Sequence, residues 1–397
     1  MSMNHKMLWA LLGVLSSITL ILSRHKTRTF PSPFRAFQRE YLAVFYTVML
    51  ADWLQGITMY DLYRGYVQDV STVNMLFLTG FATSGIVSMV CGQYVDRWGR
   101  KKSCVVYCLL EIVINILEHV PNVRALFVGR LLGGCSTALL FVAFESWMVS
   151  EHHRRGFKKE WLKDTCSLAH AGNGIVAVFA GIMAHFLKHI DGDIGPFRAA
   201  IVLTVGILMY IGTQWPENYG QTEHVRVQLD RTLLWLGCVQ TLFESAMYTF
   251  VFNWVPALET QDTGLVFACF MVCVALGSVL FRIYVVDYHG STIWFGACVS
   301  QLAAIALAAV GWDHTSFVWT LGAFLVFELC VGANMACQAA LRSQRIPQHQ
   351  HASVMHMYRV PLNILTVLGI WTSGQLSWTM FACAVACQLA ACAHRFI

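Results

Sequence analysis

Long apolar segments dominate this chain and limit what it can fold into. A helix needs about twenty apolar residues to cross the hydrocarbon of a membrane. Windows of that length fit thirteen segments: 7–23, 39–59, 73–95, 103–118, 125–149, 166–187, 197–215, 232–257, 263–285, 291–311, 316–341, 354–372 and 376–394. Only 12% of the residues are charged and 57% are hydrophobic, whereas a soluble domain carries about 25% charged residues. We therefore predict an all-α protein that crosses a membrane many times.

The last twelve segments divide into two sets of six at the polar stretch 216–231. Asp52 lies in the first segment of one set, and Glu244 takes a similar place in the other. Internal repeats of this kind are typical of secondary transporters. The predicted parts are a hydrophobic anchor with a basic cytoplasmic loop at 1–37, a six-helix bundle at 38–215, a central cytoplasmic linker at 216–231 and a second six-helix bundle at 232–397.

The first apolar segment, 7–23, can be read as an uncleaved anchor or as a signal peptide. Its apolar core is long for a signal peptide, no small-x-small cleavage pattern is evident, and dense positive charge follows at once. These features favour an uncleaved anchor.

Lysine and arginine gather in alternate loops, which is the pattern expected of loops on the cytoplasmic side. One set of loops holds Arg24, Lys26, Arg28, Arg35, Arg39, Arg97, Arg100, Lys101, Lys102, Arg154, Arg155, Lys158, Lys159, Lys163, Arg226, Arg231, Arg342 and Arg345. The opposite set holds only Lys6, Arg64, Arg124, Lys188 and Arg198. This asymmetry predicts a cytoplasmic C-terminus, and we expect the plasma membrane as the location.

Residues 92–102 form the most specific motif, Gly-Gln-Tyr-Val-Asp-Arg-Trp-Gly-Arg-Lys-Lys. It is similar to the signature G-x-x-x-D-R-x-G-R-(R/K) of the major facilitators, which lies between their second and third core helices. A glycine permits a tight turn, and an aspartate can accept hydrogen bonds from a helix N-terminus or an arginine. The predicted gate residues are Gly92, Asp96, Arg97, Gly99, Arg100 and Lys101, with Glu145 expected to form a salt bridge to Arg97 or Arg100. An ordinary basic loop is the alternative.

Further sequence blocks resemble one family within the major facilitators, the molybdate-anion transporters. These blocks are Asp52-Trp53-Leu54-Gln55-Gly56 with Tyr60 and Tyr63, Gly129-Arg130 with Gly133-Gly134, Ala143-Phe144-Glu145-Ser146-Trp147, Leu242-Phe243-Glu244-Ser245, and Arg359-Val360-Pro361-Leu362. They follow the family's order over nearly the whole chain. The resemblance implies a major facilitator fold, with two six-helix bundles around a central cavity plus an extra N-terminal transmembrane segment, and a role in molybdate uptake.

Ionisable residues inside a membrane are costly and usually face a cavity or a partner. On the resemblance, the first and fourth helices of each half line the cavity, which favours Asp52, Gln55, Arg130, Glu244, Tyr248 and Asn334 as substrate-binding residues. Arg359 joins them because Pro361 frees a backbone carbonyl and can mark a bend. For Glu111 and Glu328 a buried structural pair is the favoured interpretation.

An oxyanion such as molybdate requires cationic and N–H donors, yet acids outnumber bases in the apolar segments. One solution is that Arg130 or Arg359 holds the anion while a carboxylate carries a coupling proton. The alternatives are a transporter of a sugar or other organic solute, for which Trp53 or Trp254 could stack, and a solute sensor that does not transport. The scattered histidines offer no constellation for an enzyme.

Other partners find no support in the sequence. The 14 cysteines lie in apolar runs without metal-ligand or disulfide spacing. His152, His153, His349 and His351 are expected in solvated cytoplasmic loops rather than at a metal site. We therefore expect no cofactor, no metal and no nucleic acid, and a monomer surrounded by membrane lipid.

Overall fold

The computed structural model describes residues 3–22, 30–220, 230–260, 262–346, 351–371 and 374–397. Arg24, Lys26, Arg28, Arg226 and His349 lie outside these ranges, as does most of the predicted linker 216–231. The chain forms two compact units. The N-terminal unit is His25–Glu223, and the C-terminal unit combines Met1–Arg24 with His224–Ile397.

Helices make up both units, and the described residues contain no β-strand. The N-terminal unit holds α2 (Ser32–Tyr66), α3 (Val70–Trp98), α4 (Arg100–Glu118), α5 (Val123–Arg154), α6 (Lys159–Asp191), η1 (Gly192–Ile194) and α7 (Gly195–Gln214). The C-terminal unit holds α1 (Met3–Leu22), α8 (Arg231–Leu258), α9 (Thr263–Phe281), η2 (Arg282–Asp287), α10 (Thr292–Trp312), α11 (Phe317–Arg345), α12 (His351–Trp371), α13 (Leu376–Ala393) and η4 (His394–Phe396). Each of the thirteen predicted segments corresponds to one α-helix, so the all-α prediction is confirmed.

Nine helical runs among the described residues are long and apolar enough to cross a membrane. The three α-helices outside these runs are α4, α8 and α12. They carry charged side chains within the apolar stretch, such as Glu111, Glu244 and Arg359.

Both units use the same scheme of helix packing. In the N-terminal unit α3 packs on α5, α4 on α5 and α7, and α2 on α6 and α7. In the C-terminal unit α9 packs on α11, α10 on α11 and α13, and α8 on α12 and α13. Every pair is reproduced six helices further along the chain, which is the arrangement expected of a duplicated six-helix bundle.

Glycine allows α9 and α11 to approach until their backbones touch. A Cβ atom built on Gly277 would lie 1.9 Å from the carbonyl oxygen of Leu329, and one on Gly332 would lie 1.8 Å from that of Val274. The Ser278 hydroxyl donates across the same crossing to the Gly332 carbonyl at 3.0 Å. Small residues at such crossings are how helices gain close packing in lipid.

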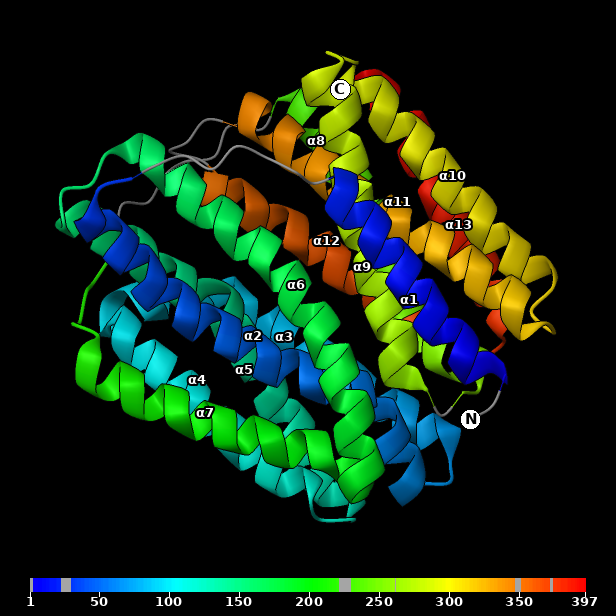
Figure 1. The fold of residues 1–397 in the computed structure, drawn as a ribbon, viewed down its shortest axis with the longest axis horizontal. Helices are drawn as coiled ribbons and strands as arrows, with labels where there is room; N and C mark the ends of the chain where they lie inside the picture. The colour runs from blue at the N-terminus through cyan, green and yellow to red at the C-terminus, as the bar shows by residue number, and fades with distance from the viewer. Residues whose placement is uncertain (1–2, 23–29, 221–229, 261, 347–350, 372–373) are drawn as a thin grey trace. The chain divides into compact units, whose positions relative to one another are not determined.

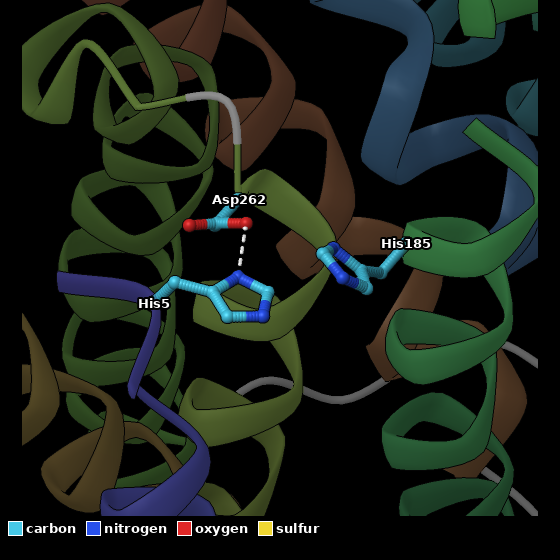
Figure 2. Close-up of side chains that lie close together, drawn as sticks. All are labelled: His5, His185 and Asp262. Carbon is cyan, nitrogen blue, oxygen red and sulfur yellow. Dashed lines mark hydrogen bonds and ion pairs between the residues drawn. The ribbon is translucent and has the colours of Figure 1, made fainter. Parts of the chain in front are cut away.

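The extra helix α1 packs against α9 within the C-terminal unit (Figure 1). Near its N-terminus, His5 Nδ1 lies 2.9 Å from the Asp262 carboxylate (Figure 2). At its other end, Arg282 donates to the Leu22 carbonyl at 2.8 Å. His185, also drawn in Figure 2, belongs to the N-terminal unit. Polar contacts therefore hold both ends of α1 to the bundle.

A side chain caps the N-terminus of α3 outside the apolar run. Asp69 accepts hydrogen bonds from the Thr72 hydroxyl at 2.7 Å and from the N–H groups of Thr72 and Ser71 at 3.0 and 3.2 Å. These bonds, above all the one from the Thr72 hydroxyl, lower the pKa of the Asp69 carboxyl. The cap satisfies backbone donors that a helix start leaves unpaired.

The α9–α11 crossing predicts a sharp difference between two glycine substitutions. Gly277→Ala should lower the melting temperature of the purified protein by several degrees, because overpacking costs about 1–3 kcal/mol even where side chains can yield. The matched control is Gly322→Ala, also in this unit, since a Cβ there meets no heavy atom within 4 Å. Thermal unfolding in detergent measures both, and equal melting temperatures would contradict the close approach.

Candidate functional site

Arg130, a predicted substrate-binding residue, sits in a buried ion pair. Its guanidinium donates to Glu118 at 3.0 Å. The Tyr63 hydroxyl donates to the same carboxylate oxygen at 2.7 Å, and the guanidinium lies 5.6 Å from the centre of the Tyr63 ring. Glu118 is fully buried. The charge of Arg130 is thus balanced locally, on α5, by a carboxylate from α4.

Asp52 and Gln55 lie beside a second buried carboxylate of the same unit. Gln55 Nε2 donates to Glu111 at 3.0 Å, and the Ser136 hydroxyl donates to the other Glu111 oxygen. Asp52, one turn before Gln55 on α2, interacts electrostatically with Glu111 and Arg130. The structure therefore brings Asp52, Gln55 and Arg130 into one polar region of the N-terminal unit, and the partners of Glu111 are neutral donors rather than the ionic pair expected for it.

Three other predicted residues converge in the C-terminal unit. Glu244 and Tyr248, one turn apart on α8, both interact electrostatically with Arg359 of α12. A second guanidinium joins them, because Arg342 of α11 also interacts with Glu244 and donates to Gln240 of α8 at 3.0 Å. Glu244 forms no direct ion pair with a described residue.

Asn334 lies on α11 two turns before Arg342. It is 1% exposed, and its side-chain oxygen has no hydrogen-bond partner among the described residues. Gln338, one turn further on, is equally buried, and neither its Nε2 nor its Oε1 has a partner in the described part of the chain. Buried polar groups without partners are rare in native proteins and call for an explanation.

The gate motif forms the junction between α3 and α4. Asp96 pairs with Arg100 at 2.8 Å, and its backbone carbonyl accepts from the Gly220 N–H at 3.1 Å. Gly99 has a φ of +115°, and a Cβ there would lie 2.6 Å from the Glu217 carboxyl carbon. Only glycine fits this turn without strain. Gly92 lies within α3, seven residues before Gly99.

Glu217 completes this junction from the start of the linker. Its two carboxylate oxygens accept from the N–H groups of Lys101 and Lys102 at 2.9 and 3.1 Å, which satisfies the first donors of α4. Trp147 donates to the Pro216 carbonyl at 2.9 Å, and its ring stacks on Trp215 with centroids 3.6 Å apart. Lys101 Nζ also donates to the Gly212 carbonyl at 2.9 Å. The start of the linker is thus fastened to α4 and α5.

Glu145 does not form the salt bridge predicted for it. Its side chain is exposed and makes no ion pair with Arg97 or Arg100 in the described structure; the guanidinium of Arg100 pairs with Asp96, one turn before it. Glu145 interacts electrostatically with Tyr41 instead. The Arg97 side chain is exposed.

The predicted solvated loop at His152 is also wrong. Helix α5 continues to Arg154, and His152 is fully buried between the rings of Phe34 and Phe157. Its Nε2 lies 3.0 Å from the Lys158 carbonyl oxygen. Glu151 accounts for the longer helix, because it draws Arg154 and Arg155 into ion pairs at 2.8 and 2.7 Å.

Sequence reasoning missed Glu118, Glu217, Arg342 and Gln338. The first three lie at segment ends or in the linker, where charge is expected for reasons of sidedness alone. Gln338 carried a usable signal, because Asn334, Gln338 and Arg342 follow one another at intervals of four on one helix face.

Two comparisons with known proteins establish the class. A family model of major facilitators, described as sugar transporters with 12 transmembrane segments, matches residues 3–310. A crystal structure of the POT family transporter PepTSo superposes with a TM-score of 0.75 over 93% of this chain and 98% of that one. At 11% identity this likeness shows the fold. The protein is therefore a major facilitator, as the gate motif predicted.

Relatives of higher identity include molybdate-anion transporters. The molybdate-anion transporter of Xenopus tropicalis is 34% identical over 358 residues, which cover 85% of this chain and 79% of the relative. The molybdate-anion transporter of Takifugu rubripes is 31% identical over 395 residues, which cover 87% of this chain and 81% of that relative. The chain belongs to the molybdate-anion transporter family. Its relatives are named as transporters rather than enzymes.

The Arg130–Glu118 pair predicts a stability effect that needs no substrate. Arg130→Met should lower the melting temperature strongly, because a buried charge left without its partner costs about 3–5 kcal/mol. Adding Glu118→Gln should restore much of the loss, since the unpaired charge is then gone. Unfolding of the purified variants in substrate-free detergent buffer measures both. An Arg130→Met variant as stable as wild type would show that the pair is not structural.

Proposed function

We propose that this protein is a secondary transporter that moves molybdate across a membrane by alternating access. The observation that carries the proposal is the similarity to molybdate-anion transporters, at 34% identity over 85% of the chain. The retained gate motif adds support, because a protein that only sensed its solute would not need one.

The proposed substrate-binding residues are those predicted from the sequence: Asp52, Gln55, Arg130, Glu244, Tyr248, Asn334 and Arg359. Asp52, Gln55 and Arg130 lie together in one unit, and Glu244, Tyr248 and Arg359 interact in the other, which supports this assignment. Charged side chains inside a membrane protein usually mark a substrate or ion pathway. A carboxylate in these regions is proposed to carry a coupling proton.

The gate residues Gly92, Asp96, Arg97, Gly99, Arg100, Lys101 and Glu145 are proposed to control access from the cytoplasm. The pairing of Asp96 with Arg100 supports such a role for the junction of α3 and α4. The proposal places the C-terminus in the cytoplasm, keeps α1 as an uncleaved segment, and takes the protein to be a monomer in the plasma membrane, with six-helix bundles at 38–215 and 232–397.

Accumulation of molybdate tests the transport proposal. Cells lacking their own molybdate uptake should accumulate molybdate when they express the wild-type chain, and cells carrying the empty vector should not. Excess tungstate should compete because it has the same charge and shape, whereas a sugar should not. Inductively coupled plasma mass spectrometry of washed cells gives the readout.

Two outcomes would overturn the proposal. Expression at the cell surface without molybdate accumulation excludes molybdate as the substrate. Competition by a sugar but not by tungstate would favour a sugar transporter, the class that the matching family model describes.

A further inference from the structure

A group of side chains on α8, α11 and α12 carries two guanidinium groups around one carboxylate. We propose that Arg342 and Arg359, together with the Gln338 amide, form a binding site for a tetrahedral oxyanion within the C-terminal unit. In this site the Glu244 carboxylate balances the arginine charge when no anion is bound, and the anion displaces it. The inference rests on the proposed function and names the residues that recognise its substrate, including two that the sequence did not single out.

The positions of these groups follow from contacts between α8 and α11. Phe327 of α11 packs on Phe250 of α8 with centroids 4.9 Å apart, and Arg342 donates to Gln240 at 3.0 Å. Gln338 lies between these two contacts and on the same helix face, because it precedes Arg342 by one turn. It is therefore directed toward α8, where Glu244 lies one turn from Gln240.

The Gln338 amide is the second observation that points to a ligand. It is 1% exposed, and neither polar atom has a partner among the described residues. Leaving a buried N–H donor unpaired is costly, so the Gln338 amide is expected to have a hydrogen-bond partner at some stage of the transport cycle. An oxyanion oxygen accepts from an amide N–H in the way the site requires.

The charges favour an anion more strongly here than at Arg130. In the C-terminal unit Arg342 and Arg359 both interact electrostatically with Glu244, which forms no direct ion pair with a described residue. In the N-terminal unit Arg130 is engaged by Glu118 at 3.0 Å and stacks near Tyr63. A dianion gains more beside Arg342, which no carboxylate of a described residue pairs directly, than beside a guanidinium that is already balanced.

Arginine also suits the shape of the ligand. Its planar guanidinium presents paired N–H groups that match two oxygens of an oxyanion. Arg342 makes one hydrogen bond to a described residue, through Nη1 to Gln240, so further donors remain for a ligand. Molybdate, tungstate and sulfate share the tetrahedral dianionic form that this donor set recognises.

Binding of molybdate to the purified full-length protein tests the site. The melting temperature in detergent is measured across a molybdate titration, with sodium chloride at equal ionic strength as the control. Arg342→Gln, Arg359→Gln and Gln338→Leu should each weaken the apparent affinity, the arginine variants by about tenfold or more, since a hydrogen bond to a charged group contributes enough for such a change. Arg342→Lys keeps the charge and should fall between wild type and Arg342→Gln.

The matched control is Arg345→Gln. Arg345 lies in the same last turn of α11, is exposed, and donates to the Ile397 carbonyl at 3.2 Å. This variant should bind molybdate as wild type does. Glu244→Gln should bind it severalfold more tightly, because the competing carboxylate charge is removed.

The outcomes separate this inference from the proposed function. If cells accumulate molybdate and the titration gives equal affinities for wild type, Arg342→Gln and Arg359→Gln, the site is wrong and the function stands. If Glu244→Gln weakens binding, Glu244 is not displaced by the anion. If neither molybdate nor tungstate stabilises the wild-type protein, the anion site is excluded; absence of accumulation in cells then decides the function separately.

Discussion

Hydrocarbon offers no hydrogen-bond partner, and this single constraint shapes the whole chain. Every backbone donor must be satisfied within a helix, so the sequence folds into helices that are joined by short polar turns. Side-chain polar groups meet the same requirement, and they bind one another between helices, as Glu118 binds Arg130 and Gln240 binds Arg342. Glycine crossings such as that of Gly277 and Gly332 then bring the helices close enough for these groups to reach one another.

The two units share a packing scheme but differ in their electrostatics. A crossing like that of α9 and α11 occurs between α3 and α5, where a Cβ on Gly134 would lie 2.8 Å from the Gly80 carbonyl oxygen. In the N-terminal unit, however, the arginine is balanced by Glu118, and Glu111 is held by neutral donors. In the C-terminal unit two arginines share one carboxylate. A duplicated fold thus carries two different sites, because packing constrains the backbone far more than it constrains the charges.

The sequence predicted the helices well because each one is marked by a long run of apolar residues. Such a run can be recognised without knowing which residues it contacts. Glu244 and Tyr248 were predicted as cavity residues only through the resemblance, and Arg359 through the bend expected at Pro361; in the structure the three interact. The sequence prediction failed at polar residues near helix ends, which can belong either to a cytoplasmic loop or to a longer helix. Arg342 was assigned to a basic loop by the distribution of positive charge, but α11 runs on to Arg345 and carries Arg342 inward. His152 was misplaced in the same way, because α5 extends beyond its apolar core to Arg154.

Alternating access by rocking of two bundles requires each bundle to stay rigid while their relation changes. The contacts at the start of the linker serve that requirement. Glu217 caps α4, and the stacked rings of Trp147 and Trp215 hold residues next to it against α5. Residues 216–220 are therefore held to the N-terminal unit. The close backbone contact of α9 with α11 gives the C-terminal unit a matching rigidity, since neither helix can slide without a clash at Gly277 or Gly332.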